Sequence, residues 1–346
     1  MYISSVICIF AMKSKRNGMD LSIIVPVYNV EKYVRACIES IYRQGIDENR
    51  FEVIIVNDGT QDHSMEVIAD IIEQHPNISI INQDNLSLSV ARNNGIAKAK
   101  GLYILMPDSD DLLIDNSLAV LLDKAIETEA DIVVANYLRI NEEGHIIDSP
   151  PIHEETEIEF KEMNGDELLL NLDPNQCHVW RRLYKRSFII DNQISFVPKI
   201  NFQDVPFMHE CYLKAQKGLL TQHYLYLYRF NRSGAATASF SLEKARSLCT
   251  AIAKTWELRK IRDLSPKIMH KMEEDVYITF SLLIYRTLFS ITKISGRNQV
   301  IDMINEYVPD LRFTHGFRQK LTTFMLKKMP HFYINFYYYY SLVAYK

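Results

Sequence analysis

The run LSIIVPV, Leu21–Val27, opens the part of the chain that decides the fold. It is almost wholly apolar and rich in Ile and Val, which is typical of a strand buried on both faces of a parallel sheet. A second run of this kind, FEVIIV, occupies residues 51–56 and is followed by Asn57-Asp58-Gly59. Between the two runs, apolar residues recur at helical spacing: Val34, Cys37, Ile38 and Ile41. The first unit is therefore predicted to be strand, loop, helix and strand.

The same alternation continues through the first half of the chain. Further segments with helix or strand patterning lie at 65–72 (helix), 78–81 (strand), 90–99 (helix), 103–106 (strand), 118–126 (helix) and 132–135 (strand). This order predicts an α/β fold with a mostly parallel sheet flanked by helices, and such sheets bind ligands at the carboxyl ends of their strands. After Phe240 the pattern is helical, and we expect breaks at Pro266 and Gly296.

The composition sets broad limits on function. The chain has 346 residues, 47% of them hydrophobic, and its formal net charge of -4 gives no electrostatic reason to expect nucleic acid as a partner. Its five cysteines are scattered and odd in number, which predicts a protein of the reducing cytoplasm. Residues 1–18 are interpreted as a leader or a mis-assigned start, with Met19 as the alternative first residue.

Asp58 lies where the second predicted strand ends. A carboxylate at that edge can accept hydrogen bonds from a nucleobase or from ribose hydroxyls, whereas the alternative is that residues 57–59 only form a turn. The sequence has no glycine-rich phosphate loop of the G-x-G-x-x-G or G-x-x-x-x-G-K-[ST] kind. A dinucleotide oxidoreductase and a P-loop enzyme are thus disfavoured, and phosphates are expected to be held by a metal, Arg92 and backbone amides.

The segment DSDD, residues 108–111, places three carboxylates directly after the strand at 103–106. Like charges this close need compensation, and Mn²⁺ or Mg²⁺ suits them because hard cations prefer oxygen ligands. The alternative is that one of the last two carboxylates only caps the next helix. Asp204 lies in the apolar stretch 202–207, where partial burial would raise its pKa and make it a usable base; a helix cap is again the alternative.

In order along the chain, these segments resemble four motifs of glycosyltransferase family 2, enzymes of the GT-A fold that use nucleotide-sugar donors. SIIVPVYN at 22–29 with Glu31 is similar to the opening strand and P-x-Y-N loop, and VNDGT at 56–60 to the N-D-G-S segment. SVARNNG at 89–95 with Asn85 is similar to the N-x-G-x-S-x-A-R-N-x-G stretch, and DSDD to the D-x-D-D (DXD) motif. The resemblance implies metal ligation by Asp110. It implies that the nucleotide-sugar is bound by Pro26, Tyr28, Asn29, Glu31, Asp58, Asn85, Arg92, Asp108 and Ser109.

The resemblance extends roughly from Leu21 to Ala238. VWRRLYKR at 179–186 is similar to the segment leading towards the acceptor, and FQD at 202–204 resembles the E-D motif that carries the catalytic base. Asp204 is then the implied base, with Trp180 and Gln203 on the acceptor side. Two departures are Gln203 in place of the usual Glu and Leu86-Ser87 where a glycine is common. The chain is accordingly divided into a GT-A domain, 19–238, and a helical C-terminal region, 239–346, with a basic aromatic tail.

The resemblance implies a metal-dependent, inverting transfer of a sugar from a nucleotide-diphosphate donor, with a UDP-sugar favoured by family habit. The implied acceptor is a glycan or a lipid-linked glycan of surface polysaccharide biosynthesis. Two alternatives stay open. One is a non-catalytic module that binds sugar nucleotides, favoured by Gln203 alone. The other is a nucleotidyltransferase, which usually carries the Gly-rich loop that this sequence lacks.

The C-terminal tail combines aromatic and basic residues. No acidic residue follows Asp310, and the aromatic run 332–345 is accompanied by lysines and arginines. This combination is typical of a segment that lies on a membrane surface, so we expect peripheral contact with the inner face of the membrane. The alternative is that the aromatic residues pack against the catalytic domain.

Overall fold

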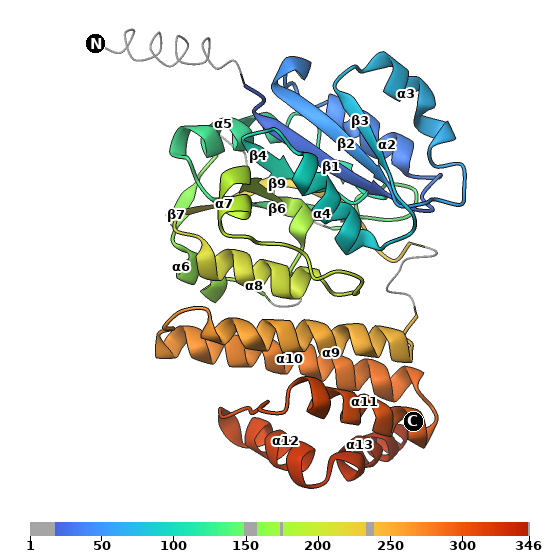
Figure 1. The fold of residues 1–346 in the computed structure, drawn as a ribbon, viewed down its shortest axis with the longest axis vertical. Helices are drawn as coiled ribbons and strands as arrows, with labels where there is room; N and C mark the ends of the chain where they lie inside the picture. Colours follow the sequence, from blue (N-terminus) through green and yellow to red (C-terminus); the bar gives the residue numbers. More distant parts are fainter. Residues whose placement is uncertain (1–17, 149–157, 174–175, 233–238, 345–346) are drawn as a thin grey trace.

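The computed structural model describes residues 18–148, 158–173, 176–232 and 239–344, so nearly all of the leader at 1–18 lies outside it. Its centre is one mixed sheet with helices on both faces, and a stack of C-terminal helices lies below it in Figure 1. The strand order is β3-β2-β1-β4-β8-β6-β9-β5, and β7 pairs with β9. The strands are β1 (Leu21–Val27), β2 (Phe51–Asn57), β3 (Ile78–Asn82), β4 (Tyr103–Leu105), β5 (Leu112–Leu113), β6 (Ile132–Ile140), β7 (Lys161–Met163), β8 (Arg182–Lys185) and β9 (Gly218–Arg229).

The half of the sheet that holds β1 to β4 is parallel, as predicted. β1 pairs with β2 along its whole length and with β4 on its other edge, and β2 pairs with β3. Every residue of β1 is buried, which explains its near-continuous apolar sequence. The predicted helix at 65–72 begins as a 3₁₀ turn, Glu66–Ile68, before it continues as α3. The helices of this half are α2 (Val34–Tyr42), α3 (Ala69–Gln74) and α4 (Leu88–Lys98).

The other half of the sheet mixes strand directions. β8 runs antiparallel to both β4 and β6, while β6 and β9 are parallel. The short strand β5, which follows DSDD directly, pairs with the end of β9. This pairing brings the last residues of β9 beside the 108–111 loop, although more than a hundred residues separate the two in sequence. The helices here are α5 (Leu118–Thr128), α6 (Gly165–Leu170), α7 (Arg186–Asp191) and α8 (Asp204–Lys214).

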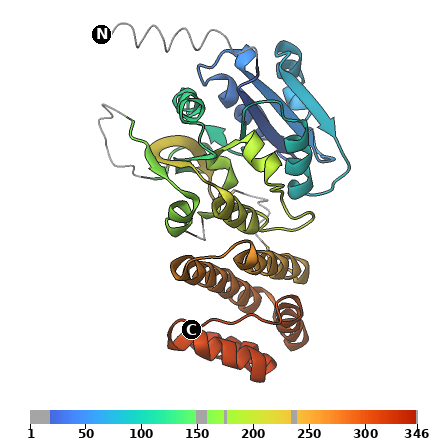
Figure 2. The same ribbon diagram turned by 60° about the vertical axis from the view of Figure 1, so that its left-hand side comes forward.

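The C-terminal helices build a hydrophobic core of their own, beneath the sheet region in Figures 1 and 2. They are α9 (Leu242–Glu257), α10 (Pro266–Ser290), α11 (Ile294–Tyr307), α12 (Gly316–Lys328) and α13 (Pro330–Ala344). α9 packs against α8, and α10 packs against α9 and α6. Within the described residues, none of the helices combines the length and the apolar character needed to cross a bilayer.

One of the two breaks predicted in this region is wrong. Pro266 begins α10 after Ser265, whose hydroxyl accepts a hydrogen bond from the Ile268 amide and so caps the helix. Gly296, in contrast, lies inside α11. A Cβ atom at this position would come within 2.8 Å of the Ile291 side chain, so the glycine permits close packing instead of ending a helix.

Candidate active site

The predicted site residues lie where several elements end at one edge of the sheet. Asp58 follows β2, the 108–111 loop follows β4, and Asp204 is the first residue of α8. Because parallel strands present their carboxyl ends on the same side, the sheet places the first two segments on one edge. α8 brings the third segment to it from the layer of helices below the sheet (Figure 1).

Arg92 joins two of these segments. Its side chain is fully buried in α4. One terminal nitrogen lies 2.6 Å from Asp108 Oδ1 and the other lies 2.8 Å from Asp204 Oδ1, so a single guanidinium bridges both carboxylates. Phe196 stacks against it with its ring centre 5.3 Å from the guanidinium carbon. The bridge fixes the predicted base and the predicted donor-binding loop relative to one another.

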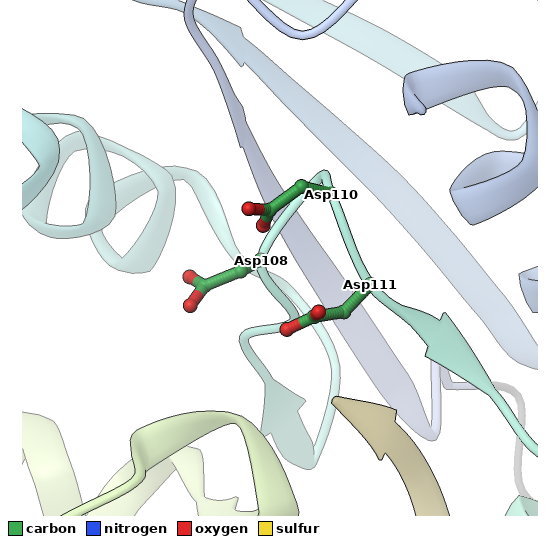
Figure 3. A group of neighbouring side chains, drawn as sticks. All are labelled: Asp108, Asp110 and Asp111. Carbon is green, nitrogen blue, oxygen red and sulfur yellow. The ribbon is translucent and has the colours of Figure 1, made fainter. Parts of the chain in front are cut away.

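Figure 3 shows the three carboxylates of the 108–111 loop close together. One oxygen from each of Asp108, Asp110 and Asp111 lies within 4.8 Å of those from the other two. Asp111 is turned into the protein, where the Tyr226 hydroxyl donates to it at 3.0 Å and the Arg229 amide donates at 2.6 Å. Its role is therefore to hold the loop against β9. Asp108 and Asp110 are left as the pair that fits a hard cation, because both offer partly exposed carboxylate oxygens.

Burial and the neighbouring carboxylates raise the pKa values of Asp108 and Asp111. Burial, together with the charges of Asp110 and Asp204 and against the opposing charge of Arg92, raises the pKa of Asp108 to about 6. Burial and the two neighbouring carboxylates raise the pKa of Asp111 well above its usual value. Burial also raises the pKa of Asp204, while Arg92 opposes that shift. A bound cation would relieve the repulsion and favour the ionised carboxylates.

The residues expected at the nucleoside lie on neighbouring loops. The Asp58 carboxylate accepts hydrogen bonds from the Gln83 side chain at 2.6 Å, the Leu86 amide at 2.8 Å and the Ser87 amide at 3.1 Å. In this structure it shapes the 83–87 loop, and its contact with a base stays a prediction. Gly59 has a φ of +69°, and a Cβ atom there would lie 2.9 Å from the Asn85 amide, so the close approach of the two loops requires glycine.

The other residues expected to bind the nucleotide-sugar lie at this edge but differ in how exposed they are. Pro26 is buried within β1, whereas Tyr28 and Asn85 are exposed. The Asn29 side chain accepts from the Gln61 amide at 2.9 Å, and Glu31 accepts from the His63 amide at 3.1 Å. Asn29 and Glu31 therefore order the loop after β2. Ser109, which follows Asp108 in the same loop, is buried.

On the acceptor side, the structure places Trp180 and Gln203 in buried positions. Trp180 is 2% exposed and stacks on Tyr226 with ring centres 4.1 Å apart, so it supports the tyrosine that holds the 108–111 loop. Tyr137 and Tyr228, which are only half-buried, contact the edge and face of its indole. Gln203 is buried, and its Oε1 has no hydrogen-bond partner among the described residues.

Three residues near the end of β9 belong to the site and had not been assigned to it from the sequence. The Tyr226 hydroxyl accepts from the Asp108 amide at 2.9 Å, in addition to its bond to Asp111. Arg229 Nε donates to the Asp110 carbonyl at 2.9 Å, and Arg232 forms an ion pair with the Asp110 carboxylate. The segment YLYR at 226–229 was the available signal, but the sequence alone did not give its register against the 108–111 loop.

Comparisons with known proteins identify the family of the chain. The family described as Glycosyl transferase family 2 matches residues 22–189. The glycosyltransferase GlyG of Streptococcus pneumoniae serotype 4 is 30% identical over 241 residues, which cover 68% of this chain and 78% of GlyG. The chain belongs to glycosyl transferase family 2. EpsJ of Bacillus subtilis (strain 168), named as an uncharacterized glycosyltransferase, is 33% identical over 212 residues, and the match spans only 61% of the length of EpsJ.

The fold of this family 2 protein is also found in a solved structure. Residues 1–349 of TarS from S. aureus, in complex with UDP-GlcNAc, match it with a TM-score of 0.68 at 21% identity. The match covers 85% of this chain and 82% of the TarS chain. The likeness confirms the predicted GT-A fold, a mostly parallel sheet flanked by helices with further helices at the C-terminus.

Proposed function

We propose that this glycosyltransferase moves a sugar from a nucleotide-diphosphate donor, with a UDP-sugar favoured, to a glycan or lipid-linked glycan acceptor in surface polysaccharide biosynthesis. The observation that carries the proposal is the Arg92 bridge, which holds the predicted base, Asp204, and the donor-loop residue Asp108 at one edge. The complex of TarS with UDP-GlcNAc supports the choice of donor, since the two chains share a fold.

A divalent cation, Mn²⁺ or Mg²⁺, is the proposed cofactor. Asp110, with Asp108 beside it, would hold the ion, which when bound neutralises charge on the departing diphosphate. Asp111 and Tyr226 keep the loop in place for this task, because each is bonded to the other and to the backbone of a second segment. Without that support, the repulsion among the carboxylates would spread the loop.

Asp204 is proposed to accept the proton of the acceptor hydroxyl. Its Oδ1 is bound by Arg92, and among the described residues no hydrogen bond uses its Oδ2. The raised pKa of Asp204 makes it a stronger base than an exposed aspartate, while Arg92 keeps it ionised. The hydroxyl oxygen would then attack the anomeric carbon from the face opposite the diphosphate, so the transfer inverts the configuration.

Screening nucleotide sugars by thermal shift with and without Mn²⁺ tests the donor assignment. A ligand that binds only the folded state raises the melting temperature, so the true donor is expected to stabilise the chain and to need the metal. If every nucleotide sugar leaves the melting temperature unchanged, the proposed function is wrong. Turnover of the stabilising donor separates an enzyme from a non-catalytic module that binds sugar nucleotides. The one feature that favours such a module is Gln203 in place of the usual Glu.

We propose in addition that α12 and α13 rest on an anionic membrane surface at the cytoplasmic side, which would bring the enzyme to a lipid-linked acceptor. α13 buries Tyr333 and Ile334 against the helix stack. Its opposite face carries exposed rings one helical turn apart: Phe332 (56% exposed), Phe336 (51%) and Tyr340 (61%). The exposed cations of α12 accompany this stripe without an ion pair among the described residues: Arg318, Lys320, Lys327 and Lys328. Rings with unpaired cations are the chemistry that recognises anionic lipid headgroups.

Vesicle co-sedimentation tests this contact. The full chain is expected to sediment with phosphatidylcholine vesicles that contain phosphatidylglycerol and to sediment less with phosphatidylcholine alone, because the cations need anionic headgroups. Phe332→Ser with Phe336→Ser should remove most of the binding, while Leu102→Ser, at an exposed leucine of the sheet region, should not. Equal sedimentation of the wild-type chain and the double variant would rule out the helix face as the contact.

A further inference from the structure

Arg181 and Arg182 are adjacent guanidinium groups that the site as described so far does not use. Arg182 is 1% exposed, and Arg181 is mostly buried in the 3₁₀ turn Val179–Arg181. Among the described residues, neither forms an ion pair with a carboxylate. Arg181 Nε and one terminal nitrogen of Arg182 are buried without a hydrogen-bond partner. Two cations thus lie side by side in the protein interior, and among the described residues no carboxylate is close enough to form an ion pair with either.

Both residues lie at the active edge. β8 is antiparallel to β4 with Tyr184 opposite Ile104, so the start of β8 lies beside the end of β4, where DSDD begins. Arg182 Nε donates to the Tyr212 hydroxyl of α8 at 2.9 Å. Asp204, at the start of α8, precedes Tyr212 by eight residues, which is close to two helical turns and places both on one face of the helix. The arginines therefore lie next to the predicted base on the side away from the nucleoside loops.

The surroundings of the pair are mostly aromatic, and the charge of Arg182 acts on the Asp204 carboxylate without forming an ion pair with it. The Arg181 guanidinium lies over the Tyr137 ring, 5.5 Å from its centre, and His178 stacks on Trp180 directly before the pair. Burial, together with the charges of the two arginines, lowers the pKa of His178 to about 3, so this imidazole is neutral. The nearby carboxylates of Asp204 and Asp110 already bind Arg92 and Arg232.

Burying a guanidinium without a counter-charge is costly, and two adjacent ones repel each other as well. Burial and the charge of Arg182 lower even the pKa of Arg181, to about 10. A fold can retain such a pair where an anionic ligand supplies the balancing charge on binding, because arginine matches phosphate oxygens with paired N–H donors. The half-buried ring of Tyr137, which lies against Arg181, and the half-buried ring of Tyr228 beside Tyr137 suit the apolar face of a sugar or polyol that carries such an anion.

We propose that Arg181 and Arg182 form an anion-binding subsite for a phosphate group of the acceptor. This rests on the proposed function, since the acceptor hydroxyl must reach Asp204 while its phosphate lies on the arginines. The diphosphate of the donor shares the same chemistry and is the other source of a phosphate. The position of the pair on the acceptor side of Asp204 favours the acceptor.

Thermal-shift titration of the full chain with inorganic phosphate, at constant ionic strength set with NaCl, tests the subsite. Phosphate is expected to raise the wild-type melting temperature. Arg181→Met should weaken the apparent affinity for phosphate at least about 10-fold, since one charge-assisted contact is lost. The same variant should melt at or above the wild-type temperature without phosphate, because it removes an unpaired buried charge. Arg181→Lys, which keeps a charge, is a second variant and should retain part of the phosphate response.

Arg139→Met is the matched control, because Arg139 also lies over an aromatic ring but is paired with Asp148. It should leave the phosphate response unchanged. An absent phosphate response, or an equal one in wild type and Arg181→Met, would overturn the subsite.

Repeating the titration with saturating UDP and Mn²⁺ separates the two sources of phosphate. If the phosphate response persists, and Arg181→Met binds UDP as tightly as the wild type, the result supports the acceptor as the source of the phosphate. A response that UDP abolishes, with UDP binding at least about 10-fold weaker in the variant, would assign the arginines to the donor and contradict the proposal. If nucleotide sugars fail to bind the wild-type chain while phosphate still does, the proposed function fails and the anion site stands.

Discussion

Two regions of the molecule are held together by different interactions. One is the carboxylate edge, where Asp58, the 108–111 loop and Asp204 lie, and the other is the C-terminal helix stack, α9 to α13. At the edge, buried charges such as Arg92 and Asp111 are held by partners from distant segments, and apolar packing serves to fix them. In the helix stack, residues such as Phe280 and Ile301 fill an apolar core, and buried charges such as Arg297 lie around it. The first region trades stability for a defined arrangement of charge, whereas the second draws its stability from burial.

The largest effect is expected at the centre of the edge. Arg92→Met should lower the free energy of unfolding by about 3–5 kcal/mol, because it leaves two neighbouring carboxylates without their shared cation. Urea denaturation measures it. The control is Arg35→Met, whose exposed pair with Asp70 should contribute less than about 1 kcal/mol. Equal losses in the two variants would mean that the edge is no more dependent on charge than the surface.

Asp204→Asn tests the carboxylate edge by removing the charge of the predicted base while keeping the size of the side chain. It should lower kcat about 10²-fold or more, since the base is lost, while donor affinity stays nearly the same because asparagine can still contact Arg92. Glu210→Gln, which makes the same kind of change on the same helix, is the control and should leave kcat within about 2-fold of the wild-type value. Near-normal turnover in Asp204→Asn would remove Asp204 from the role of base.

The contact between the two regions predicts a dependence on pH. His209 of α8 lies 3.0 Å from Asp275 of α10, and Lys271 binds the second oxygen of that carboxylate. Burial alone would lower the pKa of His209, but its bonds with Asp275 and Cys177 raise it to about 10. Because this value exceeds the unfolded value of about 6.5, the stabilisation is complete below about pH 6.5 and is lost as the pH rises through about 10.

Unfolding free energies measured from about pH 7 to about pH 10 test this contact. The wild-type value should fall by at least about 1 kcal/mol more than that of His209→Gln over this interval. The variant keeps the Lys271 bond to Asp275, so the two regions remain joined. Parallel curves for the two proteins would show that the His209 charge plays no part in joining them.

The smallest effect on stability is expected on the exposed face of α13. Phe336→Ser should change the free energy of unfolding by less than about 0.5 kcal/mol, because the ring is 51% exposed. Ile334→Ala, two residues away and fully buried, should cost clearly more. Similar costs for the two variants would mean that the aromatic stripe serves the helix stack and not a membrane.

The sequence predicted which residues lie at the carboxylate edge better than it predicted the contacts that hold them in place. Asp58 and the 108–111 loop could be placed because each follows a strand whose apolar pattern is unmistakable. Arg92 was expected to bind phosphate, yet its bridge to Asp204, which is 112 residues away, depends on the fold bringing α4 and the first residue of α8 together. Arg232, which is 122 residues from its partner Asp110, was missed for the same reason. Short-range patterns carry no register between such distant segments.

The sequence predicted that the C-terminal region is helical, but it did not predict how the helices pack. Helical periodicity after Phe240 gave the class of structure, and the spacing of Phe332 and Phe336 matches one face of a helix. Gly296 was misread because a glycine that allows close packing and one that ends a helix look the same in sequence. The division at residue 238 stays a prediction, since residues 233–238 lie outside the described part of the chain.

Calorimetric titration of a UDP-sugar in the presence and absence of Mn²⁺, with wild type and Asp110→Ala, tests the central claim most directly. The carboxylate edge is predicted to bind the donor at least about 10-fold more tightly with the metal, and Asp110→Ala should remove that gain while the chain stays folded. Donor binding that ignores the metal, or that Asp110→Ala leaves unchanged at saturating Mn²⁺, would contradict the account.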